Sequence, residues 1–242
     1  VPAAQALENV VAIGSEAFLG VATTTTGPNG LVAIGTSAGR LLTTGGNNTF
    51  VGYNSGYGVT VGSANTFFGR HTGNNMNSGS SNVLVGYTAG QYTTGSYNTF
   101  VGAEAGKGGT TSAPYSSGQS NTAMGYSALG NSRSGSFNVA IGDRALQGSW
   151  GSSYNVAVGD LSMYGATTSA YNTALGHNAL YSATTGGSNV LLGARAGYNV
   201  TIGTENVMVG HNAGYNYAGT TSGVYGAFST FIGHAAGYAV TG

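Results

Sequence analysis

The chain has no cysteine, and it is poor in proline and in charged residues. Among its 242 residues are three prolines, six basic residues and six acidic residues, so the formal net charge is zero. The absence of cysteine excludes a disulfide framework and thiolate chemistry. Without clustered lysine and arginine we expect no binding to nucleic acid, where neutralisation of phosphates supplies most of the affinity. The same scarcity argues against a polybasic patch for a membrane surface.

Long apolar runs are missing as well. No run approaches the roughly 20 residues that a helix needs to cross a bilayer, so we expect no membrane insertion. The opening residues, VPAAQALENV, lack the charged and apolar regions of a signal peptide. We therefore expect a mature chain or a segment of something longer.

Glycine, in contrast, is abundant at 45 residues, and much of it belongs to an internal repeat. Each unit reads Asn, Thr or Val, two apolar residues, Gly, two variable residues, a small residue, and Gly or a large apolar residue. Eight of the twelve spacings between the central glycines are 17 residues, and the units cover nearly the whole chain. We therefore predict one repeat domain over residues 1–242, with insertions near 21–30, 107–118 and 215–227. The thirteen central glycines are Gly14, Gly35, Gly52, Gly69, Gly86, Gly102, Gly125, Gly142, Gly159, Gly176, Gly193, Gly210 and Gly233.

The residues before each central glycine predict a short strand. With the central glycine as position 0, position −3 is always Val or Thr, and positions −2 and −1 are always apolar. β-branched residues favour an extended backbone, and successive side chains of a strand point to opposite faces. We predict an all-β fold, a parallel β-solenoid of about thirteen coils, each with this strand, a turn and a second short strand. Both faces of the first strand would be apolar.

Two further columns, each the set of residues that share one repeat position in successive coils, indicate how the coils pack. Position −4 is Asn in ten copies, and stacked asparagines can form an amide ladder along the axis. Where position −2 is bulky, position +4 is Gly; where −2 is Ala, +4 is large, except for Ala33 with Gly39. A close-packed interior resists voids and overpacking, so we predict that −2 and +4 touch. The residues that represent these structural roles are Asn48, Phe50, Gly52, Gly56, Asn98, Gly102, Asn155 and Gly159.

One apolar strand face can fill the interior of the solenoid, and the other needs a partner, which predicts a homo-oligomer. The units NVAIGDRAL, NVAVGDLSM and NTALGHNAL resemble the repeats in head domains of trimeric autotransporter adhesins. NTFVGYNSG and NVLLGARAG are similar to repeats of phage tail fibres and bacterial surface proteins. The resemblance covers roughly residues 9–242. It implies a left-handed homotrimeric β-roll in an extracellular location, at a cell surface or virion.

The expected function is that of a structural and recognition segment in such a fibre, an adhesin head or tail-fibre shaft. Its expected partners are copies of itself and a host-surface glycan or protein. We expect no cofactor and no enzymatic activity. The alternative is a subunit of a self-assembling extracellular filament. A lesser alternative is ice binding, suggested by threonine pairs such as Thr43–Thr44 and Thr167–Thr168. Adjacent residues point to opposite faces of a strand, which favours a role in turns.

Several residues raise the possibility of a site. The glycine-rich stretch NNTFVGYNSGYG lacks both Gly-Lys-Ser/Thr and a following helix, so we exclude a phosphate loop. His177, His211 and His234 share position +1 and would form a three-histidine metal site on a three-fold axis; the alternative is a polar face. Asp143 and Asp160, one coil apart, would suit glycosidase chemistry; simple surface charge is the alternative. The residues that we expect in receptor contacts, in or beside the insertions, are Tyr115, Tyr217 and Tyr225.

Overall fold

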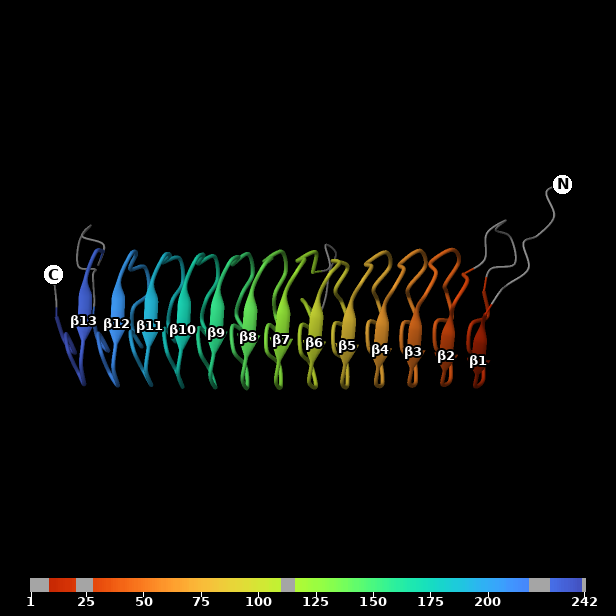
Figure 1. The fold of residues 1–242 in the computed structure, drawn as a ribbon, viewed down its shortest axis with the longest axis horizontal. Coiled ribbons are helices and arrows are strands. Elements are labelled where there is room, and N and C mark those ends of the chain that lie inside the picture. The colour runs from red at the N-terminus through yellow and green to blue at the C-terminus, as the bar shows by residue number, and fades with distance from the viewer. Residues whose placement is uncertain (1–8, 21–27, 110–115, 218–226, 241–242) are drawn as a thin grey trace. The chain divides into compact units, whose positions relative to one another are not determined.

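A computed structural model of the chain describes residues 9–20, 28–109, 116–217 and 227–240. These residues contain thirteen β-strands and no helix, so none of them forms a helix long and apolar enough to cross a membrane. They fall into two compact units, unit 1 (Val1–Ser120) and unit 2 (Asn121–Gly242). Each unit is a stack of coils with one strand per coil (Figure 1).

Each strand is three residues long and occupies positions −3 to −1 of its repeat. Unit 1 contains β1 (Val11–Ile13), β2 (Val32–Ile34), β3 (Thr49–Val51), β4 (Thr66–Phe68), β5 (Val83–Val85) and β6 (Thr99–Val101). Unit 2 contains β7 (Thr122–Met124), β8 (Val139–Ile141), β9 (Val156–Val158), β10 (Thr173–Leu175), β11 (Val190–Leu192), β12 (Val207–Val209) and β13 (Thr230–Ile232).

Within each unit every strand pairs in parallel with the strand of the next coil, equivalent residue beside equivalent residue. In unit 1, for example, Phe50 of β3 pairs with Phe67 of β4. In unit 2, Ala140 of β8 pairs with Ala157 of β9. The predicted all-β parallel solenoid is confirmed. Position −2 points into the interior, where it is buried in all the strands from β2 to β12, and positions −3 and −1 point outward.

The second strand of each coil is smaller than predicted. In its place the described residues contain turns and isolated bridges, such as Ser153 with Ala170. The reason lies in the backbone: positions −5, +2 and +4 adopt φ values near +55°, as Tyr154 (60°), Leu161 (54°) and Met163 (52°) show in one coil. A residue in the left-handed φ region interrupts an extended strand. Most of these positions carry residues other than glycine, so the sequence does not indicate this conformation.

The central glycine closes each strand for two reasons. Gly52 and Gly159 both have φ of 131°, a region open essentially to glycine alone. A Cβ on Gly159 would also lie 2.5 Å from the carbonyl oxygen of Gly176 in the next coil. Gly102, with φ of 134°, has the same conformation. The repeated glycine is therefore required by backbone conformation and by the close stacking of coils.

The interior confirms the exchange of volume between positions −2 and +4. A Cβ on Gly56 would lie 2.8 Å from Cγ of Phe50 in the same coil, so the ring fills the space beside the glycine. In the opposite type of coil, Ala157 and Met163 are both fully buried. Phe50 also packs against Phe67 of the next coil, with ring centroids 5.0 Å apart.

The predicted asparagine ladder is present in both units. Asn155 accepts two hydrogen bonds at Oδ1 from Asn172, one from its backbone N–H (3.0 Å) and one from its Nδ2 (3.2 Å). Nδ2 of Asn155 donates to the carbonyl of Ser169 (3.0 Å) and to Oδ1 of Asn138 (3.2 Å). The side chain is fully buried, so its amide is satisfied entirely by the protein. In unit 1, Asn48 and Asn98 hold the same position.

Candidate functional site

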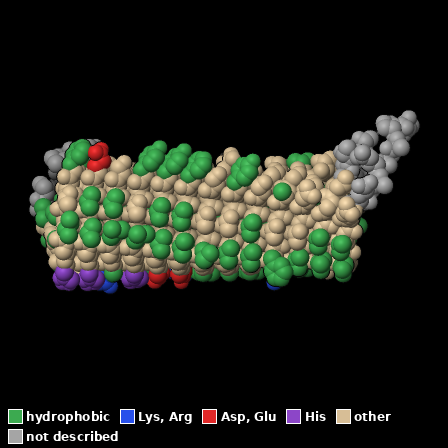
Figure 2. All heavy atoms as spheres, viewed as in Figure 1, with side chains coloured by type: hydrophobic (Ala, Val, Ile, Leu, Met, Phe, Trp, Pro, Cys, Tyr) green, Lys and Arg blue, Asp and Glu red, His purple; other side chains and the backbone are tan. Residues whose placement is uncertain are grey.

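The outward side of the strands is an uncharged, largely apolar surface, which we call the outer strand face. It consists of the side chains at positions −3 and −1, all of them Val, Thr, Ile, Leu, Met or Phe. Several are prominently exposed, including Phe68 (59%) and Ile232 (71%). Figure 2 shows hydrophobic side chains gathered over the strands of each unit. Because one face of every strand already fills the interior, the second apolar face has no partner within its own unit.

A row of stacked tyrosines follows one edge of unit 2, at position +5 of five successive coils. Its members, the tyrosine ladder, are Tyr164, Tyr181, Tyr198, Tyr215 and Tyr238. Neighbouring ring centroids lie 4.9 to 5.3 Å apart, and the rings are within 11° of parallel. Burial raises the pKa of the Tyr181 phenol, and the neighbouring Tyr198 and Tyr164 raise it further. Sequence reasoning missed this ladder, although five tyrosines in one column were a visible signal.

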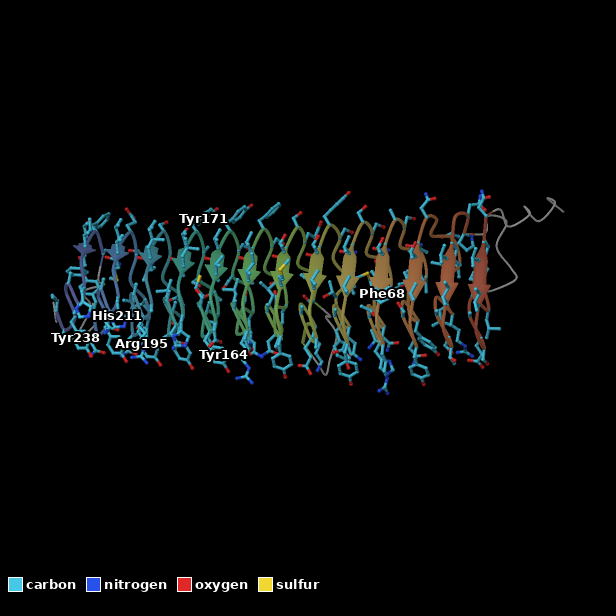
Figure 3. The ribbon with its side chains drawn as sticks, turned by 60° about the horizontal axis from the view of Figure 1, so that its bottom comes forward. Phe68, Tyr164, Tyr171, Arg195, His211 and Tyr238 are labelled. Atoms are coloured by element: carbon cyan, nitrogen blue, oxygen red, sulfur yellow. The ribbon has the colours of Figure 1, made fainter. Side chains whose placement is uncertain are left out.

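A second, shorter aromatic row lies at position −5 of unit 2. Phe137, Tyr154 and Tyr171 stack with centroids 5.0 Å apart and planes within 8° of parallel. All three side chains are about half exposed. Figure 3 shows Tyr171 at the edge opposite to Tyr164 and Tyr238 of the tyrosine ladder. Unit 2 therefore has aromatic rows at both edges, and the row at position −5 is more exposed than the tyrosine ladder.

The two carboxylates at position +1 of unit 2 each lie beside a basic residue. Asp143 lies 3.8 Å from Arg144, and Asp160 lies 3.5 Å from Nε2 of His177. All four are roughly half exposed. Each carboxylate thus has a basic residue beside it, an arginine for Asp143 and a histidine for Asp160, which favours surface charge over a glycosidase pair. Figure 2 shows acidic side chains and then histidines along this edge.

The three histidines share a column, as the sequence indicated. His211 and His234 stack with ring centroids 5.3 Å apart. His177 lies two coils before His211, beside Asn178 and Asp160. Among the described residues, no group of three His, Cys, Asp or Glu side chains could hold a metal ion. A site shared between subunits stays a prediction.

Of the three tyrosines expected to contact a receptor, Tyr115 and Tyr225 lie outside the described residues. Tyr217 is only 8% exposed, and its hydroxyl is 2.7 Å from Oγ of Ser229. Its ring packs edge-on against Phe231, with centroids 5.1 Å apart. This burial argues against the predicted receptor contact. Tyr217 occupies position +7, where other coils have the buried residues Val59 and Met76. The repeat position therefore predicts its burial better than the nearby insertion predicts exposure.

The paired threonines join neighbouring coils. The hydroxyl of Thr43 donates to the carbonyl of Thr60, and that of Thr167 donates to the carbonyl of Thr184, both at 2.8 Å. The second member is exposed in the pairs that end at Thr44, Thr168 and Thr185 and half-buried at Thr94. The hydroxyl of the first threonine in each pair therefore links neighbouring coils, in agreement with a role in turns.

Comparison with known proteins gives one short match. Residues 46–64 match a family described as the hexapeptide repeat of succinyl-transferase. No curated protein and no solved structure matches the chain. The matched segment contains β3, Asn48, Gly52 and Gly56, and it supports a repeated β-helical coil. Because the family takes its description from a transferase, the match does not exclude an enzymatic role, but it does not show one.

Proposed function

We propose that the chain is a structural and recognition segment of an extracellular fibre, and that copies of it assemble by burying the outer strand face. The observation that carries the proposal is that this face is apolar at position −1 of every strand, and Val or Thr at position −3, in both units. Contiguous apolar patches on soluble proteins mark interaction sites. The extracellular location rests on the resemblance to adhesin and tail-fibre repeats.

A second copy of the same chain is the partner that fits this face. The outward positions recur once per coil, at the roughly 4.8 Å separation of neighbouring strands. A copy of the chain has the same period, so its side chains interleave with those of the first coil by coil. No charged side chain occupies positions −3 or −1, so pairing of two such faces leaves no buried unpaired charge.

The narrowness of the face favours a closed ring over a two-fold pair. Positions −3 and −1 are about 7 Å apart along a strand, and each strand takes about 4.8 Å across the sheet, so the thirteen strands of the two units offer an area of order 440 Å². That area is well below the roughly 800 Å² that each partner buries in a stable interface. In a cyclic trimer each chain also meets two partners along its flanks, which adds contact area.

The recognition part of the proposal rests on the exposed aromatic side chains. Aromatic residues are enriched where proteins meet their partners, and Phe137, Tyr154 and Tyr171 present such side chains on a rigid stack. The expected partner is a cell-surface glycan or protein. The proposal assigns no catalytic role, because Asp143 pairs with Arg144 and Asp160 lies beside His177.

Light scattering of the purified chain after size-exclusion chromatography tests the assembly. We expect a particle of three times the chain mass of 23.9 kDa. A stable particle of one chain mass would overturn the proposal. A mass that grows with protein concentration would replace the trimer with the filament.

A further inference from the structure

Arg70 lies between two tyrosine rings on the surface of unit 1. Tyr53, Arg70 and Tyr87 occupy position +1 of three successive coils, those of β3, β4 and β5. The guanidinium carbon is 5.6 Å from the centroid of Tyr53 and 5.9 Å from that of Tyr87. Rings on either side fix the guanidinium through cation–π contacts. The two tyrosines are 48% and 49% exposed, so the cluster is open to solvent.

Two other arginines stack on tyrosine, and both have a carboxylate of the protein beside them. Arg40, 5.6 Å from the Tyr57 centroid, has Nε 3.2 Å from Glu16. Arg144, 5.8 Å from the Tyr126 centroid, lies 3.8 Å from Asp143.

Arg70 differs from both. In the described part of the chain, no carboxylate lies within ion-pair distance of Arg70, and no protein acceptor bonds its N–H groups. Its planar set of donors, which matches a carboxylate in geometry, is thus preorganised for an external acceptor.

The neighbouring histidine limits the charge of this cluster to one. His71 meets the Tyr53 ring edge-on, with centroids 5.2 Å apart. Burial lowers the pKa of His71, and the charge of Arg70 lowers it further. His71 is therefore neutral at neutral pH, and Arg70 is the one full positive charge of the cluster. A ligand with a single carboxylate fits better than a polyanion.

We propose that Tyr53, Arg70 and Tyr87 bind a carboxylate-bearing sugar, a uronic or sialic acid residue of a glycan. The guanidinium would receive the carboxylate through two parallel hydrogen bonds. The next residues of the same column are small, Thr36 on one side and Ala103 on the other. They leave the outer faces of the tyrosine rings accessible to the apolar C–H side of a sugar ring. This inference rests on the recognition part of the proposed function and is independent of the assembly.

Titration calorimetry with small glycosides tests the site on the full chain. The probes are the methyl glycosides of glucuronic acid and sialic acid, with methyl glucoside as the neutral match. We expect at least one acidic glycoside to bind, with the neutral one at least about tenfold weaker, because a charge-assisted bidentate contact is lost. R70Q should weaken acidic binding at least about tenfold, and R70K should keep part of it.

The matched control is R144Q, which removes a tyrosine-stacked arginine that already has Asp143 beside it; it should leave binding unchanged. The inference is overturned if neither acid binds, if the neutral sugar binds equally, or if R144Q weakens binding as much as R70Q. Acetate that binds as tightly as the acidic glycosides would overturn the sugar assignment. Light scattering on the same samples distinguishes the two proposals: failed binding by an intact oligomer removes only the site, and a monomer that binds removes only the assembly.

Discussion

The ring of Phe50 packs against Gly39 of the preceding coil, so closely that a Cβ on Gly39 would lie 2.9 Å from Cδ2 of Phe50. This contact explains why Gly39 departs from the exchange of volume between positions −2 and +4. The coil of Gly39 has Ala33 at position −2, and in other coils an alanine there accompanies a large residue at +4. Here the ring of Phe50 from the next coil occupies that space. An aromatic ring is needed for this effect, because Leu180 remains at +4 although Leu191 follows it at −2.

The first prediction tests this contact between coils with a double-mutant cycle. Gly39→Leu should destabilise the chain by about 1–3 kcal/mol through overpacking against Phe50, and Phe50→Ala should cost about 3–5 kcal/mol through the cavity. The double variant should lose at least about 1 kcal/mol less than the sum, because the introduced leucine side chain then fills the space of the ring. Chemical denaturation followed by circular dichroism measures the three free energies. Gly39→Leu with Phe100→Ala, a buried ring of the same unit, is the control; additive losses in both pairs would contradict the contact.

The second prediction concerns the asparagine ladder. Asn155→Ala removes a buried amide and leaves the carbonyl of Ser169 and the backbone N–H of Asn172 without their partners; Nδ2 of Asn172 still donates to the carbonyl of Gly186. Each unsatisfied buried group costs about 1–3 kcal/mol, so we expect a loss of at least about 2 kcal/mol in the free energy of unfolding. Asn131 is exposed in the same unit, and Asn131→Ala should change stability by less than about 0.5 kcal/mol. Equal effects of the two variants would show that the ladder contributes little.

Much of the fold follows from the spacing of residues, because each coil repeats the same physical requirements. The β-branched residues at position −3, the Asn155 column and the glycine at position 0 each predict a feature that the structure confirms. The size of the second strand did not follow from the sequence. Residues such as Leu161 and Met163 adopt left-handed φ values, and the stacked coils impose this conformation against their own preference.

The candidate surfaces were harder to predict for a different reason. A receptor contact was predicted for Tyr217 from its place beside an insertion. Its burial instead follows that of the apolar residues at the same position of other coils. The cluster around Arg70 is recognised from which charged side chains lie near one another. A single repeat position does not show this, because the neighbours come from several positions of the repeat. The repeat pattern therefore predicted the buried core, whereas the surface contacts could be identified only from the three-dimensional arrangement of the coils.

The third prediction tests the outer strand face directly. Ile141 points outward at position −1 of β8 and is half-buried in the single chain. Ile141→Asp would place an unpaired carboxylate in the proposed subunit interface, where burial of a charge costs several kcal/mol. We expect light scattering to report the single-chain mass, with an unchanged circular dichroism spectrum. Thr168→Asp, at an exposed turn, should leave the oligomer intact. An oligomer that survives Ile141→Asp would place the interface elsewhere.

The last prediction uses the tyrosine ladder as a sensor of alkaline pH. The pKa of Tyr181 is raised in the folded chain, so the folded state holds the phenolic proton more tightly than the unfolded state does. The resulting stabilisation is complete below the unfolded value of about 10 and is lost as pH rises through the folded pKa. Tyr181→Phe retains a ring for stacking between Tyr164 and Tyr198 but has no proton to lose. Its melting temperature should therefore fall less steeply above about pH 10 than that of the parent chain. Tyr154→Phe, in the other aromatic row, is the control, and identical slopes for the two variants would contradict the role of Tyr181.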